Sequence, residues 1–320
     1  MKKGVKIVLL IGILLLAFGL TALQFAHHRG DVSYGSFAGM TNFGSTGNLN
    51  YNQKDYTVCR SGEESFSAGK VETLKIDWIS GSVSVERWDG KDVVVREKAA
   101  AALTEAQCMR WKLSGGTLSI LPCANNAGRL PDKQLTVLVP QSLTLDALDV
   151  DSASASVLAS ALDVRGTIDL DAASGSLSIE DCRCGALKLD SASGSQSILR
   201  TSVSGDVKAN AASGSFTAEL LDCGKLNFGG ASGAVRAENL LCRSVDIDTA
   251  SGAVSLAFDA PPEKVDIDTA SGAVTLVFPK GVGLDIDFDT ASGKLRGEVF
   301  YGSLPVDVDT VSGSLTIEYK

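Results

Sequence analysis

The stretch DTASGAVSL at residues 248–256 is followed by DTASGAVTL at 268–276 and by DTASGKLRG at 289–297. Similar copies run through the second half of the chain, beginning at residues 151, 171, 190, 210, 229, 248, 268, 289 and 309. Consecutive starts are never fewer than 19 or more than 21 residues apart. Such a regular period is typical of a solenoid, in which each repeat forms one coil and contacts only its neighbours.

Inside each repeat, apolar and polar residues alternate, which is the period of a β-strand. Val265 and Ile267 share one face before the turn at 269–272, and Val274 and Leu276 continue that face after it. The sequence therefore predicts an all-β fold, a parallel β-solenoid (β-helix) of about 20-residue coils with an aliphatic interior. The expected inward pairs are Leu187 and Leu189, Val207 and Ala209, Leu226 and Phe228, Val245 and Ile247, Ile286 and Phe288, and Val306 and Val308.

A Ser-Gly pair marks the turn between the two strands of almost every repeat. Because glycine adopts positive φ angles without steric cost, we expect left-handed backbone at these glycines. The serine hydroxyl is expected to bond a nearby backbone amide, so that the serines form a ladder along the rod. The expected turn residues are Ser174 and Gly175, Ser193 and Gly194, Ser213 and Gly214, Ser251 and Gly252, Ser271 and Gly272, Ser292 and Gly293, and Ser312 and Gly313.

The N-terminus contains the longest apolar run, IVLLIGILLLAFGLTALQFA at residues 7–26. As a helix it would be about 30 Å long, which is the thickness of a hydrocarbon core. Lysines precede the run, so we expect a cytoplasmic N-terminus and an extracytoplasmic remainder. Residues 1–30 are therefore predicted to be one transmembrane helix that anchors the chain in the cell membrane. A cleaved signal peptide is the alternative, although the run is longer than the usual apolar region of such peptides.

The rest of the chain divides into three predicted parts. Residues 31–70 are rich in Gly, Ser, Asn and Thr, which predicts a flexible linker. Residues 71–140 contain strand patterns and one isolated repeat copy, and we expect a β cap module that shields the first coil. Residues 141–320 form the solenoid. Because the chain stops within its last repeat, the final coil is expected to be the open end of the rod.

Charge and residue types exclude several functions. The net charge is −9, and residues 31–320 alone carry −13, so no nucleic-acid binding is expected. The two histidines, His27 and His28, adjoin the apolar run, which leaves none for nucleophilic or zinc chemistry in the outer part. We therefore expect no enzyme activity and no cofactor. A polysaccharide-active β-helix enzyme is the least favoured alternative, because its cleft would require long loops.

Carboxylates form the most distinctive polar pattern. They repel one another when stacked about 4.8 Å apart, so bound Ca²⁺ is one hypothesis. The alternative, which we favour, is that one column accepts hydrogen bonds from its own turns while the other is solvated. The two columns in the last four repeats are Asp246, Asp266, Asp287 and Asp307, beside Asp248, Asp268, Asp289 and Asp309.

The interior positions also contain cysteine and one amide. Cys184, Cys223 and Cys242 share one position of the coil with valines in other repeats, which indicates small apolar side chains. Cys223 and Cys242 would lie in adjacent coils within reach of a disulfide, but the odd total of seven favours mostly reduced thiols. Gln196 takes a slot that is apolar elsewhere, and we predict a buried amide with partners inside the stack.

Together these motifs resemble a known family. An apolar N-terminal run, LKIDWISGSVSVERWDGKDVVV at 74–95, KQLTVLVP at 133–140 and serial DTASG repeats resemble the bacterial "putative adhesin" family of β-strand repeat proteins. This domain of unknown function includes LiaG-like membrane proteins of the cell envelope. The resemblance implies surface exposure and binding, and it brings no catalytic residues.

We therefore expect a non-catalytic, membrane-anchored surface solenoid that serves in adhesion or in cell-envelope binding and scaffolding. Its partners would be the cytoplasmic membrane, through residues 7–26, and a cell-wall glycan. Repeated hydroxyls and carboxylates on a flat face can match a repeating polymer. The alternative is an accessory subunit of a membrane complex that senses envelope stress, in which case the partner is another envelope protein.

Overall fold

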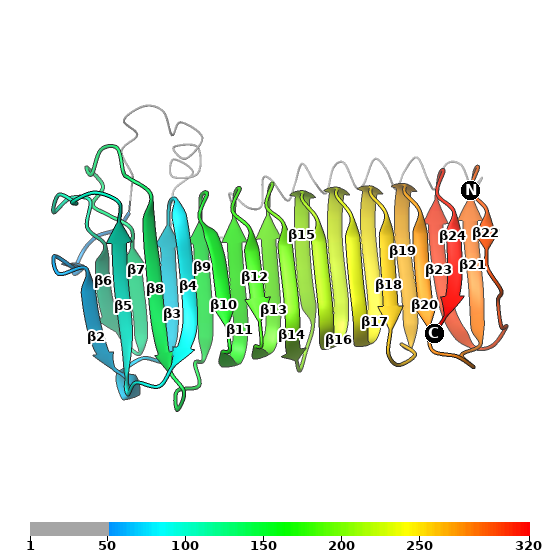
Figure 1. Ribbon diagram of the computed structural model, residues 1–320, viewed down its shortest axis with the longest axis horizontal. Helices are drawn as coiled ribbons and strands as arrows, with labels where there is room; N and C mark the ends of the chain where they lie inside the picture. The colour runs from blue at the N-terminus through cyan, green and yellow to red at the C-terminus, as the bar shows by residue number, and fades with distance from the viewer. Residues whose placement is uncertain (1–50) are drawn as a thin grey trace.

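The computed structural model describes residues 51–320, which form one β-solenoid rod (Figure 1). This part of the chain contains 24 strands and, apart from a 3₁₀ turn at Ala68–Lys70, no helix. None of its segments could cross a bilayer as a helix. The predicted anchor, residues 7–26, lies outside the described residues, as does the first half of the predicted linker.

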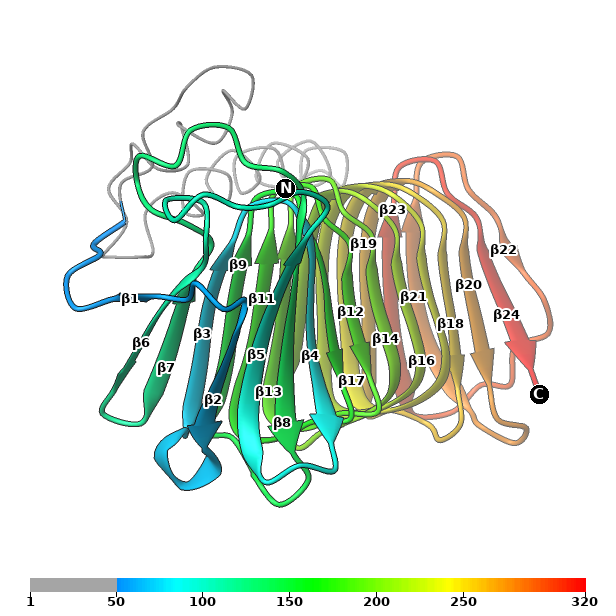
Figure 2. The same ribbon diagram turned by 60° about the vertical axis from the view of Figure 1, so that its left-hand side comes forward.

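Two parallel sheets face each other across the rod (Figure 2). We call them the acidic sheet and the hydroxyl sheet, after the side chains that each turns outward. The acidic sheet contains β3 (Thr73–Trp78), β9 (Ala147–Ser152), β11 (Asp163–Ala172), β13 (Arg183–Ser191), β15 (Val207–Ser213), the later parts of β16 (Phe216–Ser232) and β17 (Val235–Ser251), β19 (Lys264–Ser271), β23 (Leu304–Thr310) and β21 (Leu284–Thr290). The hydroxyl sheet contains β4 (Gly81–Trp88), β10 (Ser156–Ser160), β12 (Leu177–Glu180), β14 (Gln196–Val203), the first parts of β16 and β17, β18 (Val254–Phe258), β20 (Val274–Phe278), β24 (Leu315–Tyr319) and β22 (Leu295–Arg296).

The alternation of the sequence decides what lies between the sheets. Val265, Ile267, Val274 and Leu276 are all buried, and the same positions of other coils form one continuous core. Aromatic rings fill the wider layers, as where Phe258 stacks on Phe278 with centroids 5.2 Å apart. The predicted fold class and inward faces are confirmed for the described residues.

The coils do not follow one another in strict sequence order. β23 pairs with β19 on one side and with β21 on the other, and β24 pairs likewise with β20 and β22. The last repeat is therefore inserted between its two predecessors, and Figure 1 shows the red strands β23 and β24 inside the orange strands β21 and β22. The expectation that the final coil forms the open end is wrong. Ile286 and Phe288 are only partly buried because their strand, β21, lies at the end.

The N-terminal end contains a matching inversion and a cover. β3 and β4 lie between the coil of β9 and β10 and an outer coil made of β7 (Thr117–Leu121) and β8 (Lys133–Pro140). Antiparallel strands then cover both outer edges: β5 (Asp92–Ala99) and β2 (Glu63–Ser67) beside β8, and β6 (Arg110–Ser114) and β1 (Thr57–Val58) beside β7. The predicted linker is thus wrong for residues 57–67, because these residues pair with the cap.

A buried ion pair holds the cap together. Lys133 Nζ lies 2.6 Å from Glu97 Oε1, and both side chains are at most 3% exposed. Lys133 also donates to the carbonyls of Gln107 and Pro122, and its ammonium lies 4.8 Å from the centre of the Trp78 ring. Every charge therefore has several partners, which is the condition under which an ion pair can be buried.

The turn glycines are explained by stacking more than by φ. Among those predicted, Gly214 and Gly252 have φ of 158° and 145°, and the others lie outside the positive region. At every one, however, a Cβ would meet the backbone of the neighbouring coil; at Gly272 it would lie 2.0 Å from the carbonyl oxygen of Gly252. The prediction of a left-handed turn is wrong for most of these positions, because close approach of backbones is what excludes a side chain.

The turn serines form a ladder, but with carbonyls as partners. Ser174 donates to the carbonyl of Ala153, 3.4 Å away, and Ser193, Ser213 and Ser251 donate in the same way to the neighbouring coil. The backbone amide of the turn glycine instead donates to the hydroxyl three residues before it: Gly293 to Thr290 Oγ1 and Gly313 to Thr310 Oγ1, both at 2.8 Å. The expected acceptor role of the serines is therefore corrected.

Gln196 is fully buried, as predicted. Its amide nitrogen donates to the Asn210 carbonyl at 2.7 Å, to Ser191 Oγ at 3.0 Å and to the Leu189 carbonyl at 3.2 Å. The amide thus connects two adjacent coils.

Candidate functional site

The acidic sheet turns two columns of polar side chains outward, one on either side of the inward residue of each strand. The first column contains, in order along the rod, Lys75, Asp149, Asp169, Lys188, Lys208, Asn227, Asp246, Asp266, Asp307 and Asp287. The second contains Asp77, Asp151, Asp171, Asp190, Asn210, Gly229, Asp248, Asp268, Asp309 and Asp289. We call the two together the aspartate ladder.

The structure brings all eight predicted carboxylates together, in an order that differs from the sequence. Asp307 and Asp309 lie directly beside Asp266 and Asp268, because β23 is inserted next to β19. The ladder also extends to the N-terminal end, which sequence analysis missed. The missed signal was the same Asp-x-Asp motif at 149–151 and 169–171.

Lysines compensate only part of this charge. Lys225 Nζ lies 2.7 Å from Asp246 Oδ2, and Lys264 Nζ lies 2.5 Å from Asp266 Oδ2. Both pairs belong to the first column and are about one-third to one-half exposed, so each contributes little to stability.

The second column has raised pKa values where it is most crowded. Burial, together with the charges of Asp248 and Asp309, raises the pKa of Asp268 to about 7. Burial, with Asp246 and Asp266 beside it, also raises the pKa of Asp248. In the first column, burial and the neighbouring Asp266 raise the pKa of Asp307. Asp268 therefore holds its proton well above the usual aspartate range, which is the expected response to burial beside stacked like charges.

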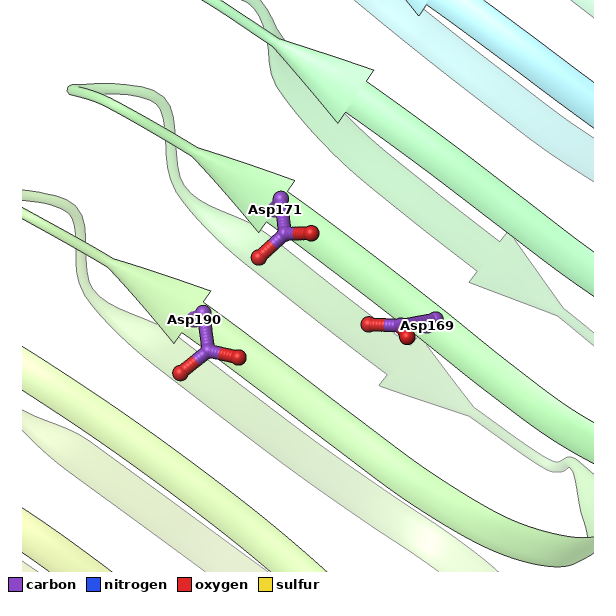
Figure 3. Close-up of side chains that lie close together, drawn as sticks. All are labelled: Asp169, Asp171 and Asp190. Atoms are coloured by element: carbon purple, nitrogen blue, oxygen red, sulfur yellow. The ribbon is translucent and has the colours of Figure 1, made fainter. Parts of the chain in front are cut away.

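Three carboxylates near the N-terminal part approach one another most closely. Asp169, Asp171 and Asp190 each place an oxygen within 4.8 Å of the others, on the neighbouring strands β11 and β13 (Figure 3). Within residues 51–320 this is the group of acidic side chains that comes closest to the geometry of a cation site. Lys188 Nζ lies 3.2 Å from Asp169 Oδ2, and Asn210 donates to Asp190 at 2.7 Å, so neighbouring side chains already contact this group.

The opposite sheet differs in chemistry. Its central outward column is mostly hydroxyl, without an aspartate: Ser84, Leu158, Ser178, Ser197, Thr217, Arg236, Ser255, Thr275, Thr316 and Arg296. The other outward column of this sheet includes Glu86, Glu180, Glu219, Glu238 and Glu318. The rod therefore has one face with two columns rich in aspartate and one face on which hydroxyls and glutamates lie side by side.

The cysteines show no reactive site in the described chain. All seven are free and buried. Cys223 and Cys242 are in register on adjacent coils, and the hydrogen bond between their thiols raises the pKa of Cys223. Burial raises the pKa of Cys182 to about 11 and of Cys184 to about 12, so these thiols stay neutral at physiological pH. Cys223 and Cys242 are free thiols in the structure, in line with the reduced state that the sequence favours.

A small pocket of about 220 Å³ opens in the cap. Cys59, Cys108 and Glu97 line it. Burial raises the pKa of both thiols, and Glu97 is engaged by Lys133, so the pocket presents no activated nucleophile.

With the coils and the ladder described, comparison with known families becomes informative. The model of the family described as Toastrack DUF4097 matches residues 71–211, 104–294 and 200–320, which together span more than half of the chain. The chain belongs to this family. The Toastrack match begins within the cap, at residue 71, and runs to residue 320, so it includes the whole aspartate ladder. No curated protein matches the chain significantly.

Two solved structures are similar to this Toastrack chain. One is a crystal structure of a "putative cell adhesion protein" from Clostridium sporogenes, 12% identical, covering 81% of this chain and 98% of its own, with a TM-score of 0.22. The other is a "putative lipid binding protein" from Parabacteroides distasonis, 16% identical, covering 83% and 97%, with a TM-score of 0.46. At this level of similarity neither one informs the function.

Proposed function

We propose that the chain is a non-catalytic binding module of the bacterial cell envelope and that the acidic sheet is its binding face. One observation supports this above all. The carboxylates of successive coils are in register, so they repeat at the strand spacing of about 4.8 Å along an even sheet. A partner that repeats along its own length can contact such a row many times, and linked weak contacts give a high overall affinity.

Charge selects the chemistry of that partner. The last four coils present eight aspartates, and Lys225 and Lys264 are the lysines paired with them in the described chain. A surface of this sign attracts amino groups and accepts hydrogen bonds from hydroxyls. The proposed partner is therefore a cell-wall glycan polymer that carries amino and hydroxyl groups.

The position in the cell follows from the sequence. Residues 7–26 are proposed to span the cytoplasmic membrane once, with the N-terminus inside. The solenoid would then stand on the outer side, where the wall polymer is found.

The test is co-sedimentation of the purified full-length chain, kept in detergent, with isolated cell walls. We expect saturable binding that weakens several-fold in the double variant Asp268→Asn with Asp309→Asn, because these carboxylates are adjacent in the crowded column. The matched control is Ser255→Ala with Thr275→Ala, adjacent on the hydroxyl sheet, which should bind as the wild type does. No binding, or equal losses in both variants, would contradict the proposal.

Repeating the binding experiment with a chelator distinguishes direct contact of the carboxylates with the polymer from contact through bound cations. If binding persists in excess EDTA, the carboxylates contact the polymer directly. If binding disappears and returns with Ca²⁺, cations bridge the ladder to the polymer, as carboxylate oxygens are suitable ligands.

A second candidate function is favoured by the uncovered end of the rod. β21 and β22 each have a partner strand on one side only within residues 51–320. An accessory subunit of a membrane complex that senses envelope stress would present this end to another envelope protein. Loss of wall binding together with co-purification of such a protein would favour this candidate.

A further inference from the structure

The end of the rod formed by β21 and β22 differs from the capped end. At the N-terminal end, antiparallel strands cover the edges of the outermost coil. At the other end, Leu284 at the start of β21 bonds the backbone of Phe300 and Gly302, and the described chain places no strand beside the rest of the outer edge of β21 or beside that of β22. Unpaired edges of this kind are templates for pairing with another chain.

Exposed apolar side chains lie at this end of the rod, on β22 and on the segment that follows it. Leu295 is 42% exposed, Phe300 46% and Tyr301 83%, and together they make up most of the large exposed hydrophobic side chains of the described chain. Ile286 and Phe288 point into the interior but are only partly buried, because no further coil covers them. The core of the solenoid is therefore open at this end.

The two edges have opposite charge. β21 turns Asp285, Asp287 and Asp289 outward, in register with Asp307 and Asp309 of the next strand. β22 pairs Leu295 with the inward Leu315, so that Lys294 and Arg296, on either side of it, are turned outward. One edge strand is acidic and the other is basic.

A two-fold rotation makes this end complementary to itself. If the axis runs parallel to the strands, β21 of one copy lies beside β22 of the other, antiparallel to it, and the two interiors join. The acidic strand of each copy then adjoins the basic strand of its partner, twice. A two-fold axis perpendicular to the sheets would instead place β21 beside β21, with aspartates opposite aspartates, which is unfavourable.

We propose that two copies of this chain associate end to end through β21 and β22, with a two-fold axis parallel to the strands. Such an isologous contact closes the core of both rods and leaves no free edge at the junction. It also continues the acidic sheet of one copy into the hydroxyl sheet of the other. The inference is independent of the proposed wall binding.

Charge-exchange variants of the full-length chain test the proposed dimer. The chain is kept in detergent, and its mass is followed by sedimentation velocity in a solvent whose density matches that of the detergent. The wild type should sediment as a dimer of the chain. Lys294→Glu with Arg296→Glu makes both edges acidic, and Asp287→Lys with Asp289→Lys makes both basic, so each double variant alone should be a monomer. An equimolar mixture of the two should recover the dimer, because each acidic edge again faces a basic one.

Two controls keep the result unambiguous. Arg236→Glu, an exposed charge on the hydroxyl sheet away from this end, should leave the dimer intact. Circular dichroism spectra of the variants should match that of the wild type, since the substituted side chains are at the surface and the fold of each copy is expected to stay the same. A monomeric wild type, dimeric double variants, or a mixture that stays monomeric would each overturn the proposal.

Discussion

At the residue scale, the adjacent coil restricts which residue type can occupy each position of the repeat. The turn glycines leave room for the backbone of the next coil, and the aspartates accept repulsion that a globular surface would avoid. Gln196 illustrates how far sequence reasoning reaches: its burial could be predicted because the neighbouring slots are apolar. The groups that its amide nitrogen bonds, two backbone carbonyls and the Ser191 hydroxyl, could not be named from the sequence. The φ of the turn glycines was predicted wrongly, because the sequence does not reveal how closely the turns stack.

Asp268 should make stability depend on pH. Its pKa of about 7 in the folded protein exceeds the value of about 3.9 of an unfolded aspartate, so folding takes up a proton between these values. Stability should therefore fall as pH rises from about 4 to about 7. Because the carboxylate is only half-buried and its charged neighbours Asp248, Asp309, Asp266 and Asp307 share the titration, we expect a loss of about 1 kcal/mol.

The variant Asp268→Asn isolates this effect. At pH 8 it should unfold at a higher temperature than the wild type, and at pH 4.5 the two should agree closely. Thermal unfolding followed at both pH values measures the difference. A variant that is less stable than the wild type at pH 8 would show that the charged carboxylate stabilises the fold.

Leu220 occupies a strained corner. Its φ is 55°, and the same corner in other coils has Asp181, Arg200 and Asn239 at 47–54°. Asparagine tolerates this conformation better than leucine, and the leucine is 46% exposed. Leu220→Asn should therefore raise the free energy of unfolding by about 0.5–1 kcal/mol. Leu241→Asn is the control, since Leu241 is 47% exposed without a positive φ, and it should give no such gain.

At the element scale, the coil is the repeating unit, and its two turns determine how closely coils stack. The serine hydroxyls and the glycine backbones of one turn contact the next turn directly. A change in one turn is therefore transmitted to both adjacent coils, and the turns are expected to be more sensitive to substitution than the outward faces.

Gly272→Ala tests whether stacking, and not φ, requires glycine. The new Cβ would lie 2.0 Å from the Gly252 carbonyl oxygen, and the φ of Gly272 is not in the positive region. We expect a loss of about 2–4 kcal/mol and a correspondingly lower thermal midpoint. Gly69→Ala, where nothing lies within 4 Å, should change the stability by less than about 0.5 kcal/mol. Equal midpoints for the two variants would show that the turns can separate freely.

Lys133→Met tests the cap. The substitution leaves Glu97 buried and without its ammonium partner, which should cost about 3–5 kcal/mol. Limited proteolysis should then cleave residues 51–140 first, while the coils from β11 onward stay protected. Lys188→Met, which removes a half-exposed pairing with Asp169, is the control and should have an effect below about 1 kcal/mol.

At the scale of the whole molecule, sequence predicts the rod but not the order of its ends. Period, inward face and strand register follow from alternation, and all of these are found in the described chain. The insertion of the last repeat does not follow, because the turn motifs DTASG at 289 and DTVSG at 309 differ at one position and either could stack on 268. One signal in the sequence pointed to an altered coil: the apolar alternation breaks at Gly297, where most other repeats have an apolar residue of the second strand.

The crossover itself has a physical signature. Gly283 and Gly302 approach so closely that a Cβ on Gly302 would lie 2.4 Å from the Cα of Gly283, and Leu304 donates to the carbonyl of Gly283. Glycine is therefore needed at both positions, because the segment that leads into β23 passes directly against the segment that leads into β21. At the other end, Arg87 bonds the carbonyls of Pro140, Gln141 and Leu143, which fixes the return from β8 to β9.

Carboxyl footprinting on cell walls tests the central claim, that the aspartate ladder is the binding face, most directly. The full-length chain is labelled at its carboxylates with a carbodiimide and an amine, with and without isolated walls, and the labelled positions are read by mass spectrometry. The account predicts that bound walls protect Asp246, Asp266, Asp287 and Asp307, while Glu219 and Glu238 on the hydroxyl sheet are labelled as before. Unchanged labelling of the aspartates, or protection confined to the two glutamates, would contradict it.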